Sequence, residues 1–188
     1  LILNLSVITC VHNLRPNMCN CVISSWTSNT FKICRVAAKY HEIEYLPEIV
    51  NLLQSLGYEV ICNIMATSLL SKNQINDFTN ITEKLNLTAI YIADSYGALY
   101  PNNVSEIFNN PKINGIHTHD NMGLAFANCI AAIDKGAEYI DGTITGMGRG
   151  VGNVTTEQLI AYNSTTSIKF WCFVSVEMSL IKAIIKVI

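Results

Sequence analysis

Charged residues are scarce in this 188-residue chain, where Asp, Glu, Lys and Arg together make up 14%. Twelve basic and 14 acidic residues leave a net charge of −2, with no basic excess. The chain therefore has no electrostatic basis for binding nucleic acid or an anionic membrane. It is instead 50% hydrophobic, which excludes a disordered polypeptide and is enough for one domain with a substantial core.

Paired Cys-x-x-Cys motifs are also missing, although the chain has seven cysteines. Their odd number and scattered positions do not form the disulfide framework of a secreted domain, so we expect reduced thiols in a cytoplasmic protein. Cys19 and Cys21 are a weak candidate pair for a metal. The first residues include no initiating Met, basic segment or cleavage pattern, so we expect no signal peptide and a start partway through a longer product.

No long apolar run is free of charge. Residues 168–188 are strongly apolar, but Lys169, Glu177, Lys182 and Lys186 interrupt them. A membrane-spanning helix would have to bury these charges, so we expect no membrane anchor. The apolar spacing fits an amphipathic helix that covers a core, or a segment removed from its usual context.

From about residue 33, short apolar runs alternate with amphipathic stretches. The apolar runs predict strands at 33–38, 60–65, 89–93, 113–119 and 139–144. The amphipathic stretches predict helices at 46–56, 67–85, 103–108, 123–135 and 155–162. Ser71 is a candidate N-cap, and Gly57 and Gly136 lie where helices should end.

Strands that recur every 25 to 30 residues or so, each followed by a helix, predict parallel βα units. Such units build either a TIM barrel or a doubly wound sheet. Five units are clear, whereas a whole barrel has eight and about 250 residues. We therefore expect an incomplete barrel, with remnants of one or two units before Phe31.

His117 and His119 end the expected strand at 113–119. Because side chains alternate along a strand, both imidazoles should point to one face and Thr118 to the other. Two neutral imidazoles can hold Zn²⁺, Mn²⁺, Fe²⁺ or a similar ion if oxygen ligands complete the shell. The alternative is a pair of ordinary core or surface histidines. Their position between an apolar strand and the next helix weakens this alternative but leaves both readings open.

Residues 146–153, Gly-Met-Gly-Arg-Gly-Val-Gly-Asn, follow the last of these strands. They lack the Gly-Lys-Ser/Thr ending of a P-loop and the spacing of a dinucleotide fingerprint. The glycines allow either close approach of backbone N–H groups to an anion or a tight structural turn. Arg149 could bind a carboxylate or lie solvated in the loop. Asn153 could offer its amide oxygen to a metal or cap the following helix.

Asp94 and Ser95 directly follow the expected strand at 89–93. A carboxylate and a hydroxyl at this place could bind a substrate carboxylate or orient a histidine. An Asx-type turn accounts for the same two residues equally well.

Three stretches of this chain resemble the DRE-TIM metallolyase superfamily, the pyruvate carboxyltransferase-like or HMG-CoA lyase-like barrels. They are GIHTHDNMGLAFAN at 115–128, GAEYIDGT at 136–143 and GMGRGVGN at 146–153, with Glu157 after them. The likeness extends more loosely over 31–162, and 163–188 form a divergent tail. It implies an α/β fold, a partial TIM (β/α)8 barrel of about five to six βα units with parallel strands. Residues 1–188 would form a single incomplete catalytic domain.

The resemblance also implies a metal centre. His117 and His119 match the two metal-binding histidines of the superfamily, and Asn153 matches a position that supplies a further ligand in some members. The implied cofactor is a divalent cation, Mn²⁺ or Mg²⁺, that holds a small 2-oxo acid through its oxygens. Ser95 and Arg149 are the implied substrate-binding residues.

Residues 94–97, Asp-Ser-Tyr-Gly, resemble the Asp-Ser-x-Gly of 4-hydroxy-2-oxovalerate aldolases, where synthases and hydroxymethylglutaryl-CoA lyases usually have Asp-Thr. Arg149 stands where isopropylmalate-type synthases tend to have Glu, and the lyases' loop cysteine is absent from 146–152. This implies an aldolase that cleaves a 4-hydroxy-2-oxo acid to pyruvate and an aldehyde. The alternatives are a Claisen-type acyl-CoA synthase and a truncated, inactive barrel. The implied partners are a second copy of the chain and an acylating aldehyde dehydrogenase.

The superfamily's Asp-Arg-Glu signature, which supplies a metal ligand and a catalytic arginine, does not occur before Phe31. Arg15 lies in Leu14-Arg15-Pro16, without a neighbouring Asp. Catalytic residues therefore stay unassigned. We expect a fragment truncated at the N-terminus, with a frameshift as one explanation of the divergent tail.

Overall fold

The structure, a computed structural model, describes residues 9–11, 33–162 and 169–172. Its strands form one sheet in which each neighbouring pair is parallel and the spatial order follows the sequence. The strands are β1 (Thr9–Val11), β2 (Ile33–Ala38), β3 (Glu59–Ile64), β4 (Ala89–Asp94), β5 (Gly115–Thr118), β6 (Tyr139–Gly142) and β7 (Lys169–Cys172). The helices are α2 (Leu46–Ser55), α3 (Lys72–Thr82), α4 (Pro101–Ile107), α5 (Ala125–Asp134) and α6 (Thr156–Tyr162), with 3-10 turns η2 (Tyr40–Tyr45), η3 (Thr67–Leu69) and η4 (Ile144–Gly146).

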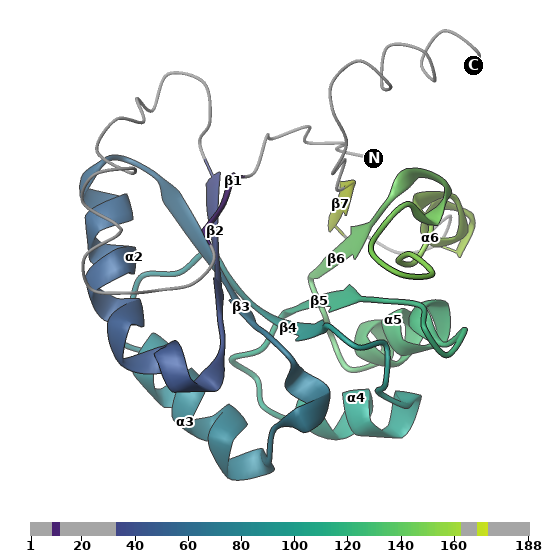
Figure 1. Cartoon of the computed structure of the whole chain (residues 1–188), viewed down its shortest axis with the longest axis horizontal. Coiled ribbons are helices and arrows are strands. Elements are labelled where there is room, and N and C mark those ends of the chain that lie inside the picture. The colour runs from purple at the N-terminus through teal and green to yellow at the C-terminus, as the bar shows by residue number, and fades with distance from the viewer. Residues whose placement is uncertain (1–8, 12–32, 163–168, 173–188) are drawn as a thin grey trace, which may run out of the picture.

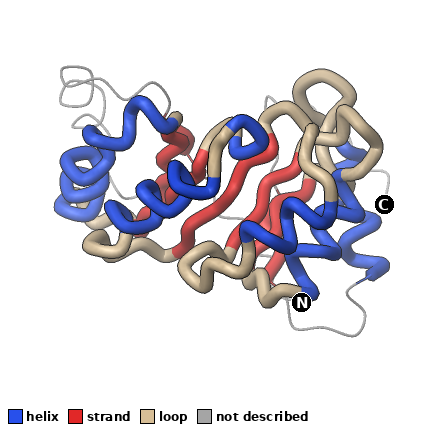
Figure 2. Tube along the Cα trace, turned by 90° about the horizontal axis from the view of Figure 1, so that it is seen from below, coloured by secondary structure: helices blue, strands red, loops and turns tan. Residues whose placement is uncertain are grey.

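The order of the strands decides between the two predicted architectures. In a doubly wound sheet the strand order reverses at a switch point. Here it runs from β1 to β7 without reversal, and the helices lie along the outer side of a curved sheet (Figure 1). Figure 2 shows the strands side by side with the helices in front of them. This is the arrangement of a TIM barrel, so the predicted partial barrel of parallel βα units is confirmed.

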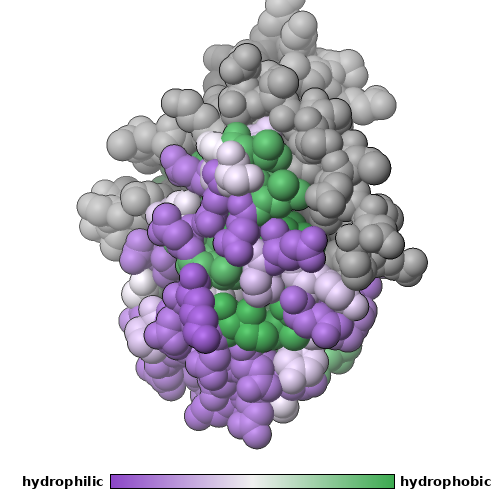
Figure 3. All heavy atoms as spheres, turned by 90° about the vertical axis from the view of Figure 1, so that its left-hand side faces the viewer, coloured by the Kyte–Doolittle hydropathy of each residue, from purple (hydrophilic) through white to green (hydrophobic). Residues whose placement is uncertain are grey.

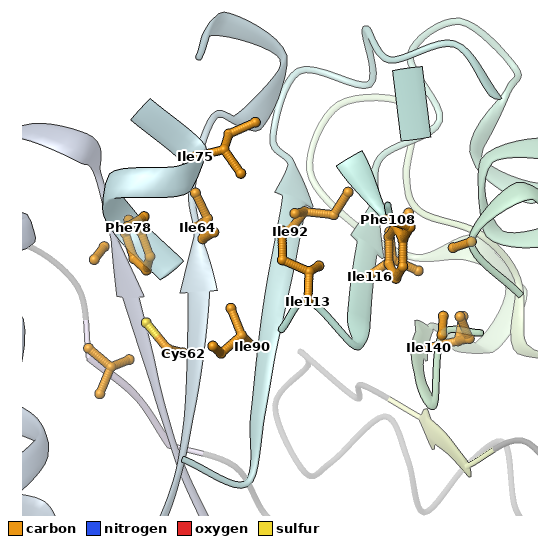
Figure 4. Close-up of a cluster of buried hydrophobic side chains, with 14 of the residues drawn as sticks. Cys62, Ile64, Ile75, Phe78, Ile90, Ile92, Phe108, Ile113, Ile116 and Ile140 are labelled. Atoms are coloured by element: carbon orange, nitrogen blue, oxygen red, sulfur yellow. The ribbon is translucent and has the colours of Figure 1, made fainter. Parts of the chain in front are cut away.

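Alternation along the strands divides the core into two clusters. Even-numbered strand residues, such as Cys62, Ile64 and Ile92, pack against the helices in the main cluster. Figure 4 shows Ile75 and Phe78 of α3 beside Cys62 and Ile64 of β3. Odd-numbered residues of β2 to β6 lie on the opposite side, which we call the inner face. Its apolar cluster consists of Ile33, Ile61, Ala89, Tyr91 and Tyr139.

Local signals in the sequence account for most element boundaries. The hydroxyl of Ser71 accepts a hydrogen bond from the Gln74 N–H at 3.3 Å, so the predicted N-cap of α3 is confirmed. Gly57 and Gly136 follow helix ends with φ of +86° and +92°, as a C′ glycine should. The single helix predicted over 67–85 is wrong at its start, because the extended Leu70 separates η3 from α3.

Helix α2 has the burial pattern of a helix that covers a sheet. Leu46, Ile49, Val50 and Leu53 are buried against the core. On the side of the molecule where α2 lies, hydrophilic residues dominate the described surface and enclose a smaller apolar area (Figure 3).

The first and the last segments that the structure describes each contribute an outer strand of the sheet. β1 pairs with β2, which places one strand before Phe31, and β7 pairs with β6. The helix suggested for 168–188 is therefore wrong at Lys169–Cys172. The rest of that tail, like Arg15, Cys19 and Cys21, lies outside the described residues. In the part of the chain that the structure describes, no helix is long and apolar enough to cross a membrane.

Candidate metal centre

His117 lies on the inner face of β5, near the strand's carboxyl end, and His119 follows immediately after the strand. Their ring centroids are 5.2 Å apart, and the ring planes meet at 77°. Thr118 is buried on the opposite side, where its hydroxyl lies 3.4 Å from the Cys129 sulfur on α5. The expected same-face placement of the two imidazoles is thus confirmed.

The glycine-rich loop brings Asn153 to these histidines. Residues His119 and Asn153 form an isolated antiparallel bridge, and the Asp120 N–H donates to the Gly152 carbonyl at 2.9 Å. The Asn153 Nδ2 lies 3.4 Å from the His117 Nε2. Asn153 does not cap α6, because the Thr155 hydroxyl accepts the hydrogen bond from the Gln158 N–H at 3.1 Å. The capping interpretation of Asn153 is therefore wrong.

Two glycines make this loop geometry possible. A Cβ at Gly148 would collide with the side-chain oxygen of Asn153, and a Cβ at Gly152 would collide with the carbonyl of Gly146. Gly152 also has a φ of +105°, which L side chains rarely adopt. The glycines therefore allow a tight backbone turn that places the Asn153 side chain beside His117.

One observation bears on whether His117, His119 and Asn153 could bind a divalent cation. The buried Oδ1 of Asn153 has no hydrogen-bond partner. Such orphaned oxygens are uncommon in protein interiors. The oxygen and nitrogen of an amide are exchanged by a simple flip, which would turn Oδ1 toward the His117 ring. Two imidazoles and an amide oxygen then form a three-donor set that suits a divalent metal. Among the described residues, no third His, Cys, Asp or Glu joins the two histidines. Mn²⁺ and Mg²⁺ prefer octahedral shells rich in oxygen, so further oxygen ligands would have to complete the site.

Two residues of the site were missed by sequence reasoning. Asp141 on β6 accepts a hydrogen bond from the His117 Nδ1 at 2.8 Å. Arg35 on β2, 106 positions away, contacts both Asp141 oxygens, with Nη2 and Oδ1 2.9 Å apart. Arg35 and Asp141 are 1% and 2% exposed. Each is a lone charge inside an apolar strand, and this signal marks buried, paired charges.

Neighbouring groups set the ionisation of this cluster. Burial alone raises the pKa of Asp141, but the charge and hydrogen bonds of Arg35, together with His117, outweigh it and leave that pKa at about 2. Burial lowers the pKa of His119, and the nearby His117 lowers it further, against a hydrogen bond to the Arg149 backbone. A metal binds the neutral form of an imidazole, so the lowered pKa of His119 favours metal binding.

The remaining predicted site residues have local roles in the fold. Asp94 faces the helices and accepts hydrogen bonds from the N–H groups of Ala98 and Leu99 at 2.9 and 3.0 Å, as in the turn interpretation. The Ser95 hydroxyl accepts the N–H of Ala66 at 2.9 Å. Arg149 is exposed in the glycine-rich loop. Substrate binding by Ser95 and Arg149 stays a prediction.

Two cavities differ in their relation to the histidines. One, of about 450 Å³, is lined by residues 146–152 and therefore adjoins the candidate metal centre. Another, of about 510 Å³, lies between α3 and α4 and is lined by residues such as Ile75 and Ile107. We assign the first to the site, because only its lining residues belong to the loop that contacts His117 and His119.

Comparison with known proteins places this site in a family. A family model described as HMGL-like matches residues 23–184. The chain belongs to the HMGL-like family. Its curated relatives include 4-hydroxy-2-oxovalerate aldolases from Pelotomaculum thermopropionicum, 34% identical over 137 residues, and Carboxydothermus hydrogenoformans, 35% identical over 135 residues. Each alignment covers 69% of this chain and 40% of the relative, so the chain spans about two fifths of the length of these relatives.

Solved structures agree with the fold. The N-terminal domain of a Bacteroides vulgatus protein described as an aldolase superposes with a TM-score of 0.66 at 27% identity, over 84% of this chain and 52% of that one. The HMG-CoA lyase of Bacillus subtilis superposes with a TM-score of 0.66 at 18% identity, over 74% and 58% of the two chains. The second likeness shows the fold alone. The predicted resemblance to the metallolyase barrels is confirmed.

Proposed function

We propose that this chain carries the metal-binding part of an aldolase that cleaves a 4-hydroxy-2-oxo acid to pyruvate and an aldehyde. The observation that carries the proposal is the convergence of His117, His119 and Asn153 at the carboxyl end of the sheet. TIM-barrel enzymes place their chemistry at this end. The names of the curated relatives support the aldolase branch over the synthase branch.

In this proposal, His117 through Nε2, His119 and Asn153 through Oδ1 hold Mn²⁺ or Mg²⁺. The cation, when bound, would orient the oxygens of the 2-oxo acid and stabilise the negative charge that develops as the carbon–carbon bond breaks. Arg149, exposed beside the site, would pair with the substrate carboxylate. The Ser95 hydroxyl would contribute a hydrogen bond at the neighbouring loop.

The resemblance further suggests a cytoplasmic enzyme, a homodimer and an acylating aldehyde dehydrogenase as partner. These three points stay predictions. A dehydrogenase partner would be chemically reasonable, because it would consume the reactive aldehyde that the proposed cleavage releases.

Pyruvate release from 4-hydroxy-2-oxovalerate in the presence of Mn²⁺ tests the proposed activity, with lactate dehydrogenase and NADH as the coupled readout. We expect turnover by a version of the chain extended at its N-terminus with the family's Asp-Arg-Glu segment, which does not occur before Phe31, and loss of turnover when that version carries His117→Ala. His41→Ala, which removes an exposed histidine on η2, is the matched control and should retain the activity. Turnover that survives His117→Ala would refute the proposal. CoA release from acetyl-CoA and a 2-oxo acid would instead favour the synthase, and no turnover in either assay the inactive barrel.

A further inference from the structure

Side chains from β2, β4, β5 and β6 meet on the inner face around one carboxylate. Asp141 receives the His117 Nδ1 on one side and the Arg35 guanidinium on the other. The Arg35 guanidinium carbon in turn lies 4.5 Å from the centre of the Tyr91 ring on β4. The pairing of Arg35 with Asp141 spans the sheet from its second strand to its sixth.

We propose that Asp141, held in place by Arg35, is a positioning residue that fixes the orientation and tautomer of His117, so that Nε2 faces the cation. The inference rests on the proposed metal centre and adds two residues that the resemblance did not assign. Asp141 and Arg35 would touch neither the cation nor the substrate. They would act through His117.

The geometry of the hydrogen bond carries the tautomer assignment. An ionised carboxylate can only accept, so the proton on a neutral His117 must lie on Nδ1, which is 2.8 Å from the Asp141 Oδ2. This leaves the Nε2 lone pair directed at the Asn153 amide, 3.4 Å away. A metal-ligating histidine commonly donates its other ring N–H to such a carboxylate.

Arg35 accounts for the fixed position of the carboxylate. Its two terminal nitrogens contact the two Asp141 oxygens, a forked arrangement that restrains rotation of the carboxylate about its own axis. The Tyr91 ring beside the guanidinium restrains the plane of the fork in turn. The Oδ2 atom is shared between Arg35 and His117, so movement of either partner would displace the other.

A purely structural ion pair is the alternative, and the tautomer distinguishes the two. In the full chain labelled with ¹⁵N-histidine, long-range ¹H–¹⁵N correlation without metal at neutral pH reports which ring nitrogen carries the proton. We expect His117 protonated at Nδ1, with its signals assigned from their absence in His117→Asn. Protonation at Nε2 would overturn the proposal. This test needs no variant of Asp141, so it does not depend on whether such a variant folds.

Mn²⁺ affinity, measured by electron paramagnetic resonance of the free ion, gives the second readout. We expect Asp141→Asn to weaken binding about 10- to 100-fold, the range for loss of such a carboxylate partner. Glu42→Gln makes the same change at a buried carboxylate on η2, which accepts a hydrogen bond from the Lys39 N–H, and it should leave the affinity unchanged. Equal affinity in Asp141→Asn and the unmodified chain would contradict the positioning role.

A double variant controls for an effect of Asp141→Asn on folding. Asp141→Asn leaves the Arg35 charge buried, whereas Arg35→Met/Asp141→Asn removes both charges together. The double variant should bind Mn²⁺ as weakly as the single variant, and binding like that of the unmodified chain would overturn the proposal. If the unmodified chain bound no Mn²⁺, the metal centre would fail, while the tautomer would still decide whether Asp141 orients His117.

Discussion

The residues that surround His117 combine two opposite demands on the interior of a protein. Charges are costly to bury, yet Arg35 and Asp141 lie on the inner face with almost no contact with solvent. Their mutual pairing and the His117 hydrogen bond offset that cost. Removal of one of the two charges should therefore destabilise the folded chain much more than removal of both.

Arg35→Met should lower the free energy of unfolding by about 3–5 kcal/mol, because it leaves the Asp141 carboxylate buried without its cation. Urea unfolding followed by circular dichroism measures this change. Arg149→Met removes an exposed arginine and should change the same quantity by less than about 0.5 kcal/mol. Similar effects of the two substitutions would show that Arg35 is not paired in the folded chain.

Cys62 and Cys129 should resist alkylation in the folded protein. Burial raises the pKa of both thiols, that of Cys129 to about 12, and the thiolate is the reactive form. Peptide mapping after N-ethylmaleimide treatment at pH 8 should find both unmodified in the native chain and modified in urea. Rapid native labelling of either cysteine would contradict its place in the core.

At the scale of elements, the loops that follow the strands position the site through close backbone packing. Gly97, after β4, has a φ of +56°. A Cβ there would lie 2.6 Å from the Asn121 nitrogen and 2.8 Å from the His119 oxygen. The β4–α4 loop thus packs directly against the segment that carries His119.

Gly97→Ala should therefore weaken Mn²⁺ binding as well as stability, because the new methyl group must displace His119 or its neighbours. Gly57→Ala is the matched control, since φ is +86° there but the surrounding space is open. Its backbone strain should cost about 1–2 kcal/mol without a change in metal affinity. Calorimetric titration with Mn²⁺ separates the two effects, and an unchanged affinity in Gly97→Ala would contradict this packing.

Most elements could be predicted from sequence because their signals are local. Apolar periodicity, the Ser71 cap and the glycines after α2 and α5 each depend on a few neighbouring residues. The Ser71 cap did mark the start of α3, but the apolar spacing that continues through Leu69 and Leu70 extended the predicted helix back to Thr67. The strand at Lys169–Cys172 escaped as well, because its apolar residues also fit a helical period.

For the whole molecule, the register of the sheet determines which distant residues meet. His117 and His119 could be paired from sequence, because strand alternation fixes them relative to each other. Asn153 required the resemblance, since only the folded glycine-rich loop brings it to His117. The Arg35–Asp141 pair could not be predicted, because its two members lie on β2 and β6 and meet only across the inner face.

Calorimetric titration of Mn²⁺ into the unmodified chain, His117→Ala and His119→Ala tests the metal centre most directly. We predict one site in the unmodified chain and its loss in both variants, with His41→Ala binding normally because that exposed histidine lies on η2. Binding that persists in His117→Ala and His119→Ala would contradict the proposed metal centre, as would a chain that binds no divalent cation.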